Sequence, residues 1–169
     1  FLLYAVSSIH AGSGSAVGIV DLPIQREKHT HYPKIESSSL KGAIRAAVSH
    51  ATGALNGNEA MKEQIKYIFG IDPEEARNGE SQAGAIAFAD ARLLLFPVRS
   101  MRGVFAWVTC PNVLKRYNRE MQLFKGGANV PIPKANTVSA EDLIVTGDQI
   151  VLEEYTFQVA YSEETSNLA

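Results

Sequence analysis

The order in which two kinds of apolar pattern alternate along the chain is the feature that most constrains its fold. Apolar residues recur at helical spacing over residues 40–51 and again over residues 114–124. Short apolar or alternating runs predict strands before, between and after these two helices, over residues 2–9, 85–95, 104–109, 143–146, 149–152 and 155–159. Apart from one additional helix, the order predicts an α+β fold, a ferredoxin-like or RNA-recognition-type βαββαβ palm.

Local signals set the expected ends of these elements. Ser37 and Ser38 are suitable N-caps for the first helix, and the additional helix spans residues 59–69 and ends at Gly70. The runs over residues 85–95 and 104–109 are apolar at nearly every position, which is typical of central strands covered on both faces. Gly147 and Asp148 separate residues 143–146 from 149–152 and predict a hairpin with a two-residue turn.

A long connection follows the first expected strand. It covers residues 10–36, is rich in glycine and contains two prolines. Connections of this length are uncommon in a compact domain unless they carry a function. The 169 residues have the length and the 46% hydrophobic content of one globular domain, so we expect a single palm domain with a functional loop inserted after its first strand.

The net charge of −2 conceals a strong asymmetry along the chain. Residues 25–45 carry five basic against two acidic side chains, residues 91–125 carry seven against one, and residues 141–164 carry seven acidic side chains and no basic one. Such a chain can bind a polyanion and also stack head to tail on copies of itself, although two solvated faces would give the same pattern. No run is long enough to span a bilayer, so we expect a soluble, cytoplasmic protein without a membrane partner.

The start of the first helix has the composition of a phosphate site. Lys41 lies in its first turn, where the helix dipole disfavours a cation, and Arg45 follows one turn later. Free backbone N–H groups, the hydroxyls of Ser38 and Ser39, and these two cations suit phosphate oxygens, while Gly42 permits close approach of a backbone. The alternative is a capped amphipathic helix with solvated basic residues.

The long connection holds the remaining candidates. Gly12 and Gly14 form a flexible turn without the following helix that a dinucleotide site requires, and His10 is either a phosphate partner or simply hydrogen-bonded within the protein. Asp21, ionised at neutral pH, can hold a hard divalent cation or orient an attacking group, or else it only caps the turn before Pro23. No Ser/His/Asp, Cys/His or zinc-type arrangement supports an ordinary nucleophilic hydrolase.

Several separated segments resemble one known family. They are residues 10–14 (HAGSG), 20–27 (VDLPIQRE), 38–45 (SSLKGAIR), 69–70 (FG), 83–85 (AGA), 90–92 (DAR), 97–100 (PVRS) and 103–109 (GVFAWVT). In order and spacing they are similar to the backbone subunits of type III-B CRISPR (Cmr) effector complexes, within the RAMP superfamily. Family members usually have Pro-Gly before the helix serines, where this chain has Glu36-Ser37, and they continue into a further glycine-rich segment, so we expect this sequence to be a fragment.

The resemblance implies a palm that binds CRISPR guide RNA, polymerises head to tail along it, and contacts target RNA and other effector subunits. It implies catalysis by Asp21, which would hold Mg²⁺ or another divalent cation and cut target RNA within the assembled complex. The resemblance also implies that residues of the long connection and of the first helix bind RNA: His10, Gly12, Gly14, Arg26, Ser38, Ser39, Lys41, Gly42 and Arg45. Two alternatives stay open: a purely structural RNA-binding subunit, and a metal-independent endoribonuclease that processes guide precursors with His10 or His29 as acid or base.

Overall fold

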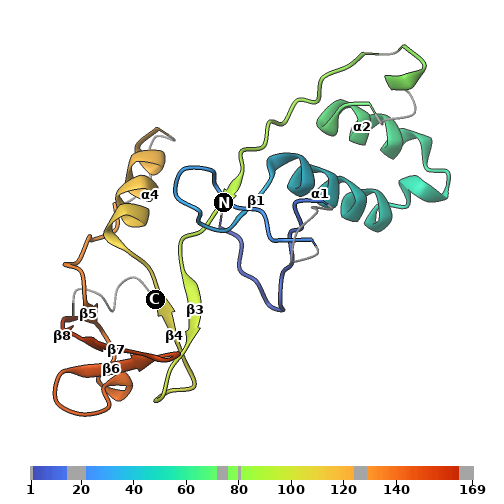
Figure 1. Cartoon of the computed structure of the whole chain (residues 1–169). Coiled ribbons are helices and arrows are strands. Elements are labelled where there is room, and N and C mark those ends of the chain that lie inside the picture. The colour runs from blue at the N-terminus through green and yellow to red at the C-terminus, as the bar shows by residue number, and fades with distance from the viewer. Residues whose placement is uncertain (1, 15–21, 72–75, 80, 124–128, 164–169) are drawn as a thin grey trace. The chain divides into compact units, whose positions relative to one another are not determined.

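The protein combines helices and short strands, as a mixed α/β chain should. The computed structural model describes residues 2–14, 22–71, 76–79, 81–123 and 129–163. The chain divides into two compact units, Phe1–Arg92 and Leu93–Ala169 (Figure 1). The strands of the described residues pair two by two: β1 (Lys34–Ile35) with β2 (Ala91–Arg92), β3 (Phe96–Arg99) with β4 (Phe105–Val108), β5 (Thr137–Val138) with β8 (Ala160–Tyr161), and β6 (Gln149–Leu152) with β7 (Tyr155–Gln158).

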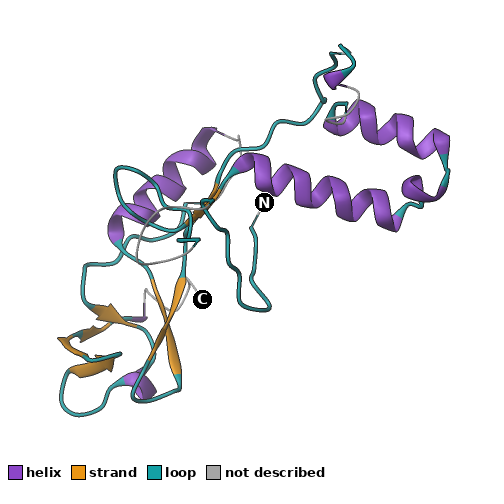
Figure 2. Cartoon of the chain, turned by 45° about the vertical axis from the view of Figure 1, so that its right-hand side comes forward, coloured by secondary structure: helices purple, strands orange, loops and turns teal. Residues whose placement is uncertain are grey.

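The first unit is built on a helical hairpin. Helix α1 (Ser37–Ala51) and helix α2 (Glu59–Phe69) run antiparallel, joined by the short 3-10 helix η1 (Ala54–Asn56) (Figures 1 and 2). Their core consists of three buried side chains and the partly buried ones around them: Ala54, Ile65 and Phe69, with Ile44, Val48, Met61, Ile68 and Phe88. Both predicted helices are thus confirmed, and their apolar faces pack against each other. In the described part of the chain, no helix is long and apolar enough to cross a membrane.

The helix ends follow local chemistry, with one correction. The Asn58 side chain accepts a hydrogen bond from the Met61 N–H at 3.3 Å and so caps α2, whose C-cap is Gly70 at φ 88°. The prediction that Ser37 or Ser38 caps α1 is wrong, because the N-cap residue is Glu36 and its side chain makes no capping bond. Ser37 is already helical, and a distant side chain satisfies its N–H, as described below.

The strand predicted over residues 2–9 is absent, since the structure assigns these residues to no strand. They are exposed, with 71% exposure at Leu2 and 91% at Val6. An apolar run becomes a strand only where a neighbouring strand completes its hydrogen bonds, and no strand pairs with this run in the described residues.

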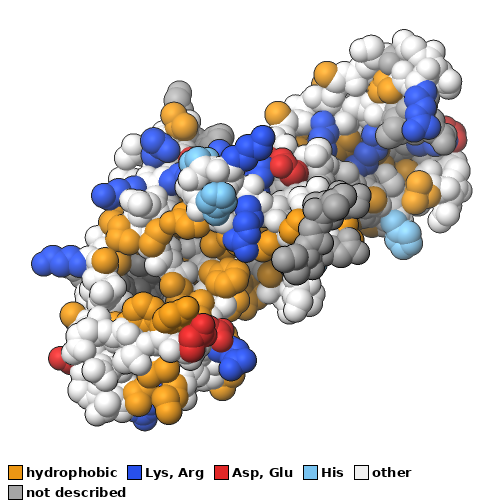
Figure 3. Space-filling model, viewed as in Figure 1, with side chains coloured by type: hydrophobic (Ala, Val, Ile, Leu, Met, Phe, Trp, Pro, Cys, Tyr) orange, Lys and Arg blue, Asp and Glu red, His pale blue; other side chains and the backbone are white. Residues whose placement is uncertain are grey.

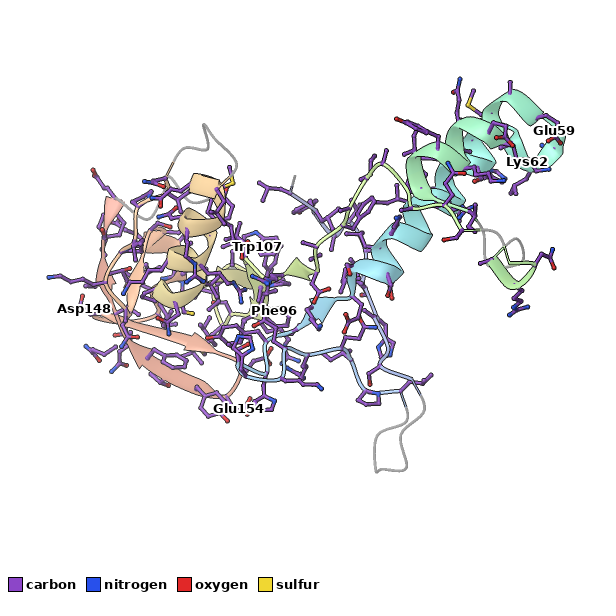
Figure 4. The ribbon with its side chains drawn as sticks, turned by 90° about the horizontal axis from the view of Figure 1, so that it is seen from above. Glu59, Lys62, Phe96, Trp107, Asp148 and Glu154 are labelled. Atoms are coloured by element: carbon purple, nitrogen blue, oxygen red, sulfur yellow. The ribbon has the colours of Figure 1, made fainter. Side chains whose placement is uncertain are left out.

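The second unit carries β3 to β8 and one long helix, α4 (Pro111–Leu123), which begins at the predicted proline and buries Val113 and Leu114. A small core forms from Val138, Ile150 and Val159. The β3–β4 hairpin places Phe105 and Trp107 edge to face, with ring centroids 5.5 Å apart. Figure 4 shows Phe96 and Trp107 on these two neighbouring strands, and Asp148 and Glu154 at opposite ends of the β6–β7 hairpin.

The predicted pairing of residues 143–146 with 149–152 is wrong. Residues 149–152 form β6, which pairs over four residues with β7 around a two-residue turn whose first member, Glu153, adopts φ 51°. Residues 141–143 instead form the 3-10 helix η2 (Glu141–Leu143). Of the expected hairpin, the Thr146–Gln149 bridge and the hydrogen bond from the Val145 N–H to the Gln149 carbonyl remain. Four ladder pairs therefore hold β6 against β7, whereas a single bridge joins residue 146 to residue 149.

The two runs predicted to be central strands, residues 85–95 and 104–109, also differ from the prediction. Most of residues 85–95 are assigned to no strand and contribute only the two residues of β2. In β4 the single buried side chain is Ala106, while Phe105 and Trp107 are 46% and 41% exposed. A two-stranded hairpin leaves one face open to solvent. The apolar content of residues 104–109 therefore did not mean that both faces of this strand are covered.

Candidate functional site

The long connection folds into a ribbon of three extended segments, which we call the strap and define as residues 10–14 and 22–36. The first segment pairs with the second: the Ser13 N–H donates to the Pro23 carbonyl at 2.9 Å, and the Gln25 N–H donates to the Ala11 carbonyl at 2.8 Å. The second segment then pairs with the third, through a 2.9 Å hydrogen bond from the Glu27 N–H to the Tyr32 carbonyl. The expected loop is therefore a hydrogen-bonded structure.

His10, Gly12 and Gly14 lie on the first segment of the strap. The His10 Nε2 lies 3.0 Å from the Leu22 carbonyl oxygen, so His10 joins two segments of the protein itself. Gly12 is bridged to Ile24, whereas Gly14 is exposed with φ 90°, a left-handed conformation that favours glycine. Of these residues, Gly14 presents the most open backbone.

The far turn of the strap contains a buried carboxylate that the sequence analysis did not single out. The Glu27 side chain is 5% exposed and accepts a hydrogen bond from the Thr30 hydroxyl. The exposed His29 ring lies 3.8 Å from the same carboxylate. The Arg26 guanidinium donates to the His31 carbonyl at 2.8 Å, across a turn in which His31 has φ 61°. Arg26 thus braces the turn while remaining exposed.

The N-terminus of α1 is held by Asp90, which lies just before β2. One Asp90 carboxylate oxygen accepts from the Ser37 N–H at 2.9 Å, and the other accepts from the Lys34 ammonium at 2.8 Å. Glu36 also lies 2.8 Å from that ammonium. Lys34 and the Ser37 N–H lower the pKa of Asp90, while Asp90 and Glu36 raise the pKa of Lys34. A carboxylate of the protein thus already occupies part of the predicted anion site.

The rest of the first two turns is open to a ligand. Ser38, Ser39 and Gly42 are exposed, and Lys41 is partly buried. Because α1 begins at Ser37, Lys41 lies in its second turn, and the prediction that it lies in the first turn is wrong. The first intrahelical bond comes from the Leu40 N–H at 3.0 Å, so the amides of Ser38 and Ser39 precede the regular pattern. A Cβ at Gly42 would meet no atom within 4 Å, which leaves room for an approaching backbone.

Arg45 has a structural contact that the sequence did not suggest. Its guanidinium donates to the Ile71 carbonyl at 2.9 Å and so ties α1 to the segment after α2. Because a guanidinium carries five N–H donors, this bond leaves others for a ligand. Arg45 therefore serves the fold whether or not it also binds a phosphate.

Asp21 lies outside the described residues, so its predicted catalytic and metal-binding roles stay predictions. Among the residues that are described, no three His, Cys, Asp or Glu side chains gather in a group that could hold a metal ion. On the face drawn in Figure 3, Lys and Arg side chains occur in several separate places and form no continuous basic patch.

Sequence reasoning missed Asp90 and Gln25, the two residues that hold the strap and α1 together. Asp90 lies 53 residues from its partner Ser37, and no local pattern links them. The only signal was that Asp90 lies in the quoted segment DAR and Gln25 lies in the quoted segment VDLPIQRE. A polar residue inside an otherwise apolar segment, such as Asp90 after residues 85–89, is a reason to look for a buried or bridging role.

Comparison with known proteins places these features in a family. A model of the RAMP superfamily matches residues 2–164. The chain is 39% identical over 160 residues to the CRISPR system Cmr endoribonuclease Cmr4 of Pyrococcus furiosus, covering 93% of this chain and 51% of that protein. It is 38% identical over 104 residues to the CRISPR system CMR subunit Cmr4 of Saccharolobus solfataricus, covering 60% of this chain and 29% of that protein.

Solved structures agree in fold. The crystal structure of oligomeric Cmr4 from Pyrococcus furiosus matches with a TM-score of 0.69 at 33% identity, over 96% of this chain and 55% of that one. A type III-B Cmr-beta complex bound to cognate target RNA contains a chain that matches with a TM-score of 0.64 at 24% identity, over 92% of this chain and 56% of that one. The chain spans about half the length of the Pyrococcus relative. The family model covers nearly the whole sequence, and the resemblance is confirmed: the chain belongs to the RAMP superfamily.

Proposed function

We propose that this chain is part of an RNA-binding backbone subunit of a type III-B CRISPR effector complex. The observation that carries the proposal is the 39% identity to Cmr4, which extends over 93% of the chain. The open first turn of α1 and the ordered strap beside it give that similarity a physical basis, since exposed amides and a nearby cation suit RNA phosphates. In this function the whole palm would have the ferredoxin-like order, and the protein would act in the cytoplasm.

The first two turns of α1 bind the guide backbone in this proposal. Ser38, Ser39 and Lys41 contact phosphate oxygens, and Gly42 leaves space for the RNA. Gly12, Gly14, His10 and Arg26 of the strap form the adjoining contact surface. Phosphate contacts carry affinity without base information, so binding should be insensitive to guide sequence and sensitive to salt.

Lys41→Ala tests the phosphate site without disturbing the Arg45 contact to Ile71. In the full-length protein, guide affinity should fall for all sequences, and the slope of log K against log salt should shrink by about 0.7 for a single-stranded RNA. The matched control is Lys62→Ala on α2, where Lys62 is exposed and paired with Glu59 (Figure 4). Equal affinity and slope in Lys41→Ala and the control would reject the site.

Asp21 provides the cleavage site of this subunit. A carboxylate together with RNA phosphate oxygens suits Mg²⁺, and such an ion would neutralise charge at the scissile phosphate. In this proposal Asp21 would hold the ion and orient the attacking group.

Asp21→Asn in the assembled complex should abolish Mg²⁺-dependent cleavage of complementary RNA and leave guide and target binding near the wild-type values. Cleavage at the wild-type rate would favour a purely structural subunit. Cleavage of guide precursors in EDTA by the protein alone would instead favour a metal-independent processing enzyme.

Self-association follows from the need to track a linear polyanion. The partners are guide RNA, target RNA, further copies of this subunit through unlike surfaces, and other effector subunits. The acidic residues 141–164 should lie away from the RNA, where they do not repel phosphate. A closed two-fold dimer of the full-length protein that buries α1 and persists with guide RNA would contradict this arrangement.

A further inference from the structure

Two exposed aromatic side chains lie side by side on the β3–β4 hairpin (Figure 4). The rings of Phe105 and Trp107 meet edge to face with centroids 5.5 Å apart. Ala106 between them is buried, so both rings project from the opposite face of the strand. An antiparallel sheet that packs one face on a core normally carries polar side chains on the other face. Two exposed rings at such positions are a reason to look for a binding partner.

The strand register adds a cation to the same face. Arg99 lies directly opposite Phe105, and Pro97 lies directly opposite Trp107, so all four side chains share one face of the hairpin. The Arg99 side chain is 86% exposed, and its Nε lies 3.5 Å from a carboxylate oxygen of Glu153. A guanidinium carries five N–H donors, so this ion pair leaves others for a ligand. The face therefore presents two aromatic rings beside an accessible cation.

A second aromatic pair in the same unit provides a comparison. Tyr155 and Phe157 lie on β7, exposed and with ring centroids 6.4 Å apart. Phe157 lies directly opposite the buried Ile150, so these rings share a face with a residue of the core. Residues 149–158 contain two glutamates and no basic residue, whereas residues 96–108 contain two arginines and no acidic residue. Of the two pairs, the pair on β4 therefore has the charge that suits a polyanion.

We propose that Phe105, Trp107 and Arg99 form a platform on which unpaired bases of single-stranded RNA stack. This inference rests on the proposed function and adds to it a contact with bases, distinct from the phosphate site on α1. Aromatic rings and guanidinium planes accept any base, because every base has a π face. A base inside a duplex hides both faces against its neighbours, so the ligand of the platform is an unpaired stretch of RNA.

A stacking platform makes affinity depend on the bases and not on the phosphates. Loss of an aromatic ring that stacks on a base lowers affinity about 5- to 100-fold. The number of phosphate contacts stays the same, so the slope of log K against log salt should not change. An RNA analogue without bases keeps its phosphates but offers nothing to stack. Loss of the rings should therefore leave its affinity unchanged.

The test compares the double variant Phe105→Leu/Trp107→Leu with wild type in the full-length protein. Fluorescence anisotropy measures binding to a labelled single-stranded RNA of mixed sequence and to a chain of abasic ribose analogues of the same length. The double variant should bind the RNA about 10-fold more weakly and the abasic chain within about 2-fold of wild type. The matched control is Tyr155→Leu, the same kind of change in the other aromatic pair, which should bind both ligands like wild type.

Far-UV circular dichroism checks the fold of each variant. If the double variant does not fold, Trp107→Leu and the ring-preserving Trp107→Phe replace it, and only Trp107→Leu should lose affinity for the base-containing RNA. Wild-type protein should itself prefer that RNA to the abasic chain at equal salt. Wild-type affinity in the leucine variants would overturn the platform. Equal losses on both ligands would also overturn it, because they would show that this face packs against protein.

Lys41→Ala separates the platform from the proposed function. It should weaken binding to the RNA and to the abasic chain by the same factor, because it removes a phosphate contact. Wild-type affinity of Lys41→Ala for both ligands would overturn the phosphate site on α1, while a base-dependent loss in the leucine variants would still support the platform. A wild-type protein that binds neither ligand would overturn the proposed function and the platform with it.

Discussion

The helical hairpin and the strap belong to the same unit but are held together by different forces. In the hairpin, Ala54, Ile65 and Phe69 are buried among apolar neighbours, and the Phe69 and Phe88 rings stack with centroids 6.4 Å apart. The strap buries a carboxylate, Glu27, and is connected by hydrogen bonds. Apolar burial stabilises without specifying direction, whereas each hydrogen bond fixes one donor against one acceptor. Apolar burial therefore stabilises the hairpin, whereas hydrogen bonds fix the positions of the strap segments relative to one another.

The largest expected effect comes from emptying the core of the hairpin. Phe69→Ala should lower the free energy of unfolding by about 3–5 kcal/mol, because it removes a buried ring and its packing. Urea unfolding followed by far-UV circular dichroism measures the change. Tyr67→Ala, at a position 67% exposed on the same helix, should change stability by no more than about 0.5 kcal/mol. Equal losses in the two variants would show that apolar burial does not hold the hairpin.

A smaller loss should follow from crowding the backbone beside the hairpin. A Cβ at Gly84 would lie 2.5 Å from the Phe69 carbonyl carbon and 2.7 Å from the Gly70 nitrogen, both backbone atoms. Gly84→Ala should therefore destabilise by about 1–3 kcal/mol. Gly42→Ala is the opposite case, since its Cβ meets nothing within 4 Å in a helix interior, and it should stabilise by about 0.5–1 kcal/mol. Thermal unfolding of the two variants tests whether their signs differ.

The strap should respond to the loss of a single hydrogen bond. Thr30→Val removes the hydroxyl that donates to the buried Glu27 carboxylate and should cost about 1–2 kcal/mol. Hydrogen–deuterium exchange should show faster exchange in the strap and little change in α1 and α2. Thr156→Val, at an exposed position of β7, is the control. Faster exchange spread evenly over both regions would mean that strap and hairpin unfold as one unit.

The smallest effect is a dependence on pH at the junction of strap and hairpin. Because the pKa of Asp90 is lowered from its ordinary value of 3.8, its contribution to stability is present above that pH and is lost as the pH falls through the folded value. Lys34 has its pKa raised above 10.5, so its contribution is present below that pH and is lost as the pH rises further. Asp90→Asn should weaken the pH dependence of the free energy of unfolding at both low and high pH, as measured by urea unfolding over a pH series. An unchanged dependence on pH would argue against the contact between Asp90 and Lys34.

Some elements could be predicted because their signals are local. Helix α2 begins after Asn58 and ends at Gly70, as its cap residues indicate, and α4 begins at Pro111. The segments that resemble the RAMP superfamily also lie within short stretches of sequence. The placement of Ser38, Ser39 and Gly42 in the first two turns of a helix followed from the helix assignment alone.

The sequence by itself therefore determined helices α1, α2 and α4, the mixed α/β class and the family, because helical periodicity, caps and motifs are properties of neighbouring residues. Only the tertiary structure decided that β6 pairs with β7, that Asp90 holds Ser37, and that Gln25 bonds to Gly12 and Glu36. Each of these contacts depends on which distant backbone groups are brought within about 3 Å. Every backbone N–H and carbonyl offers the same chemistry to a partner, so the choice among them belongs to the fold.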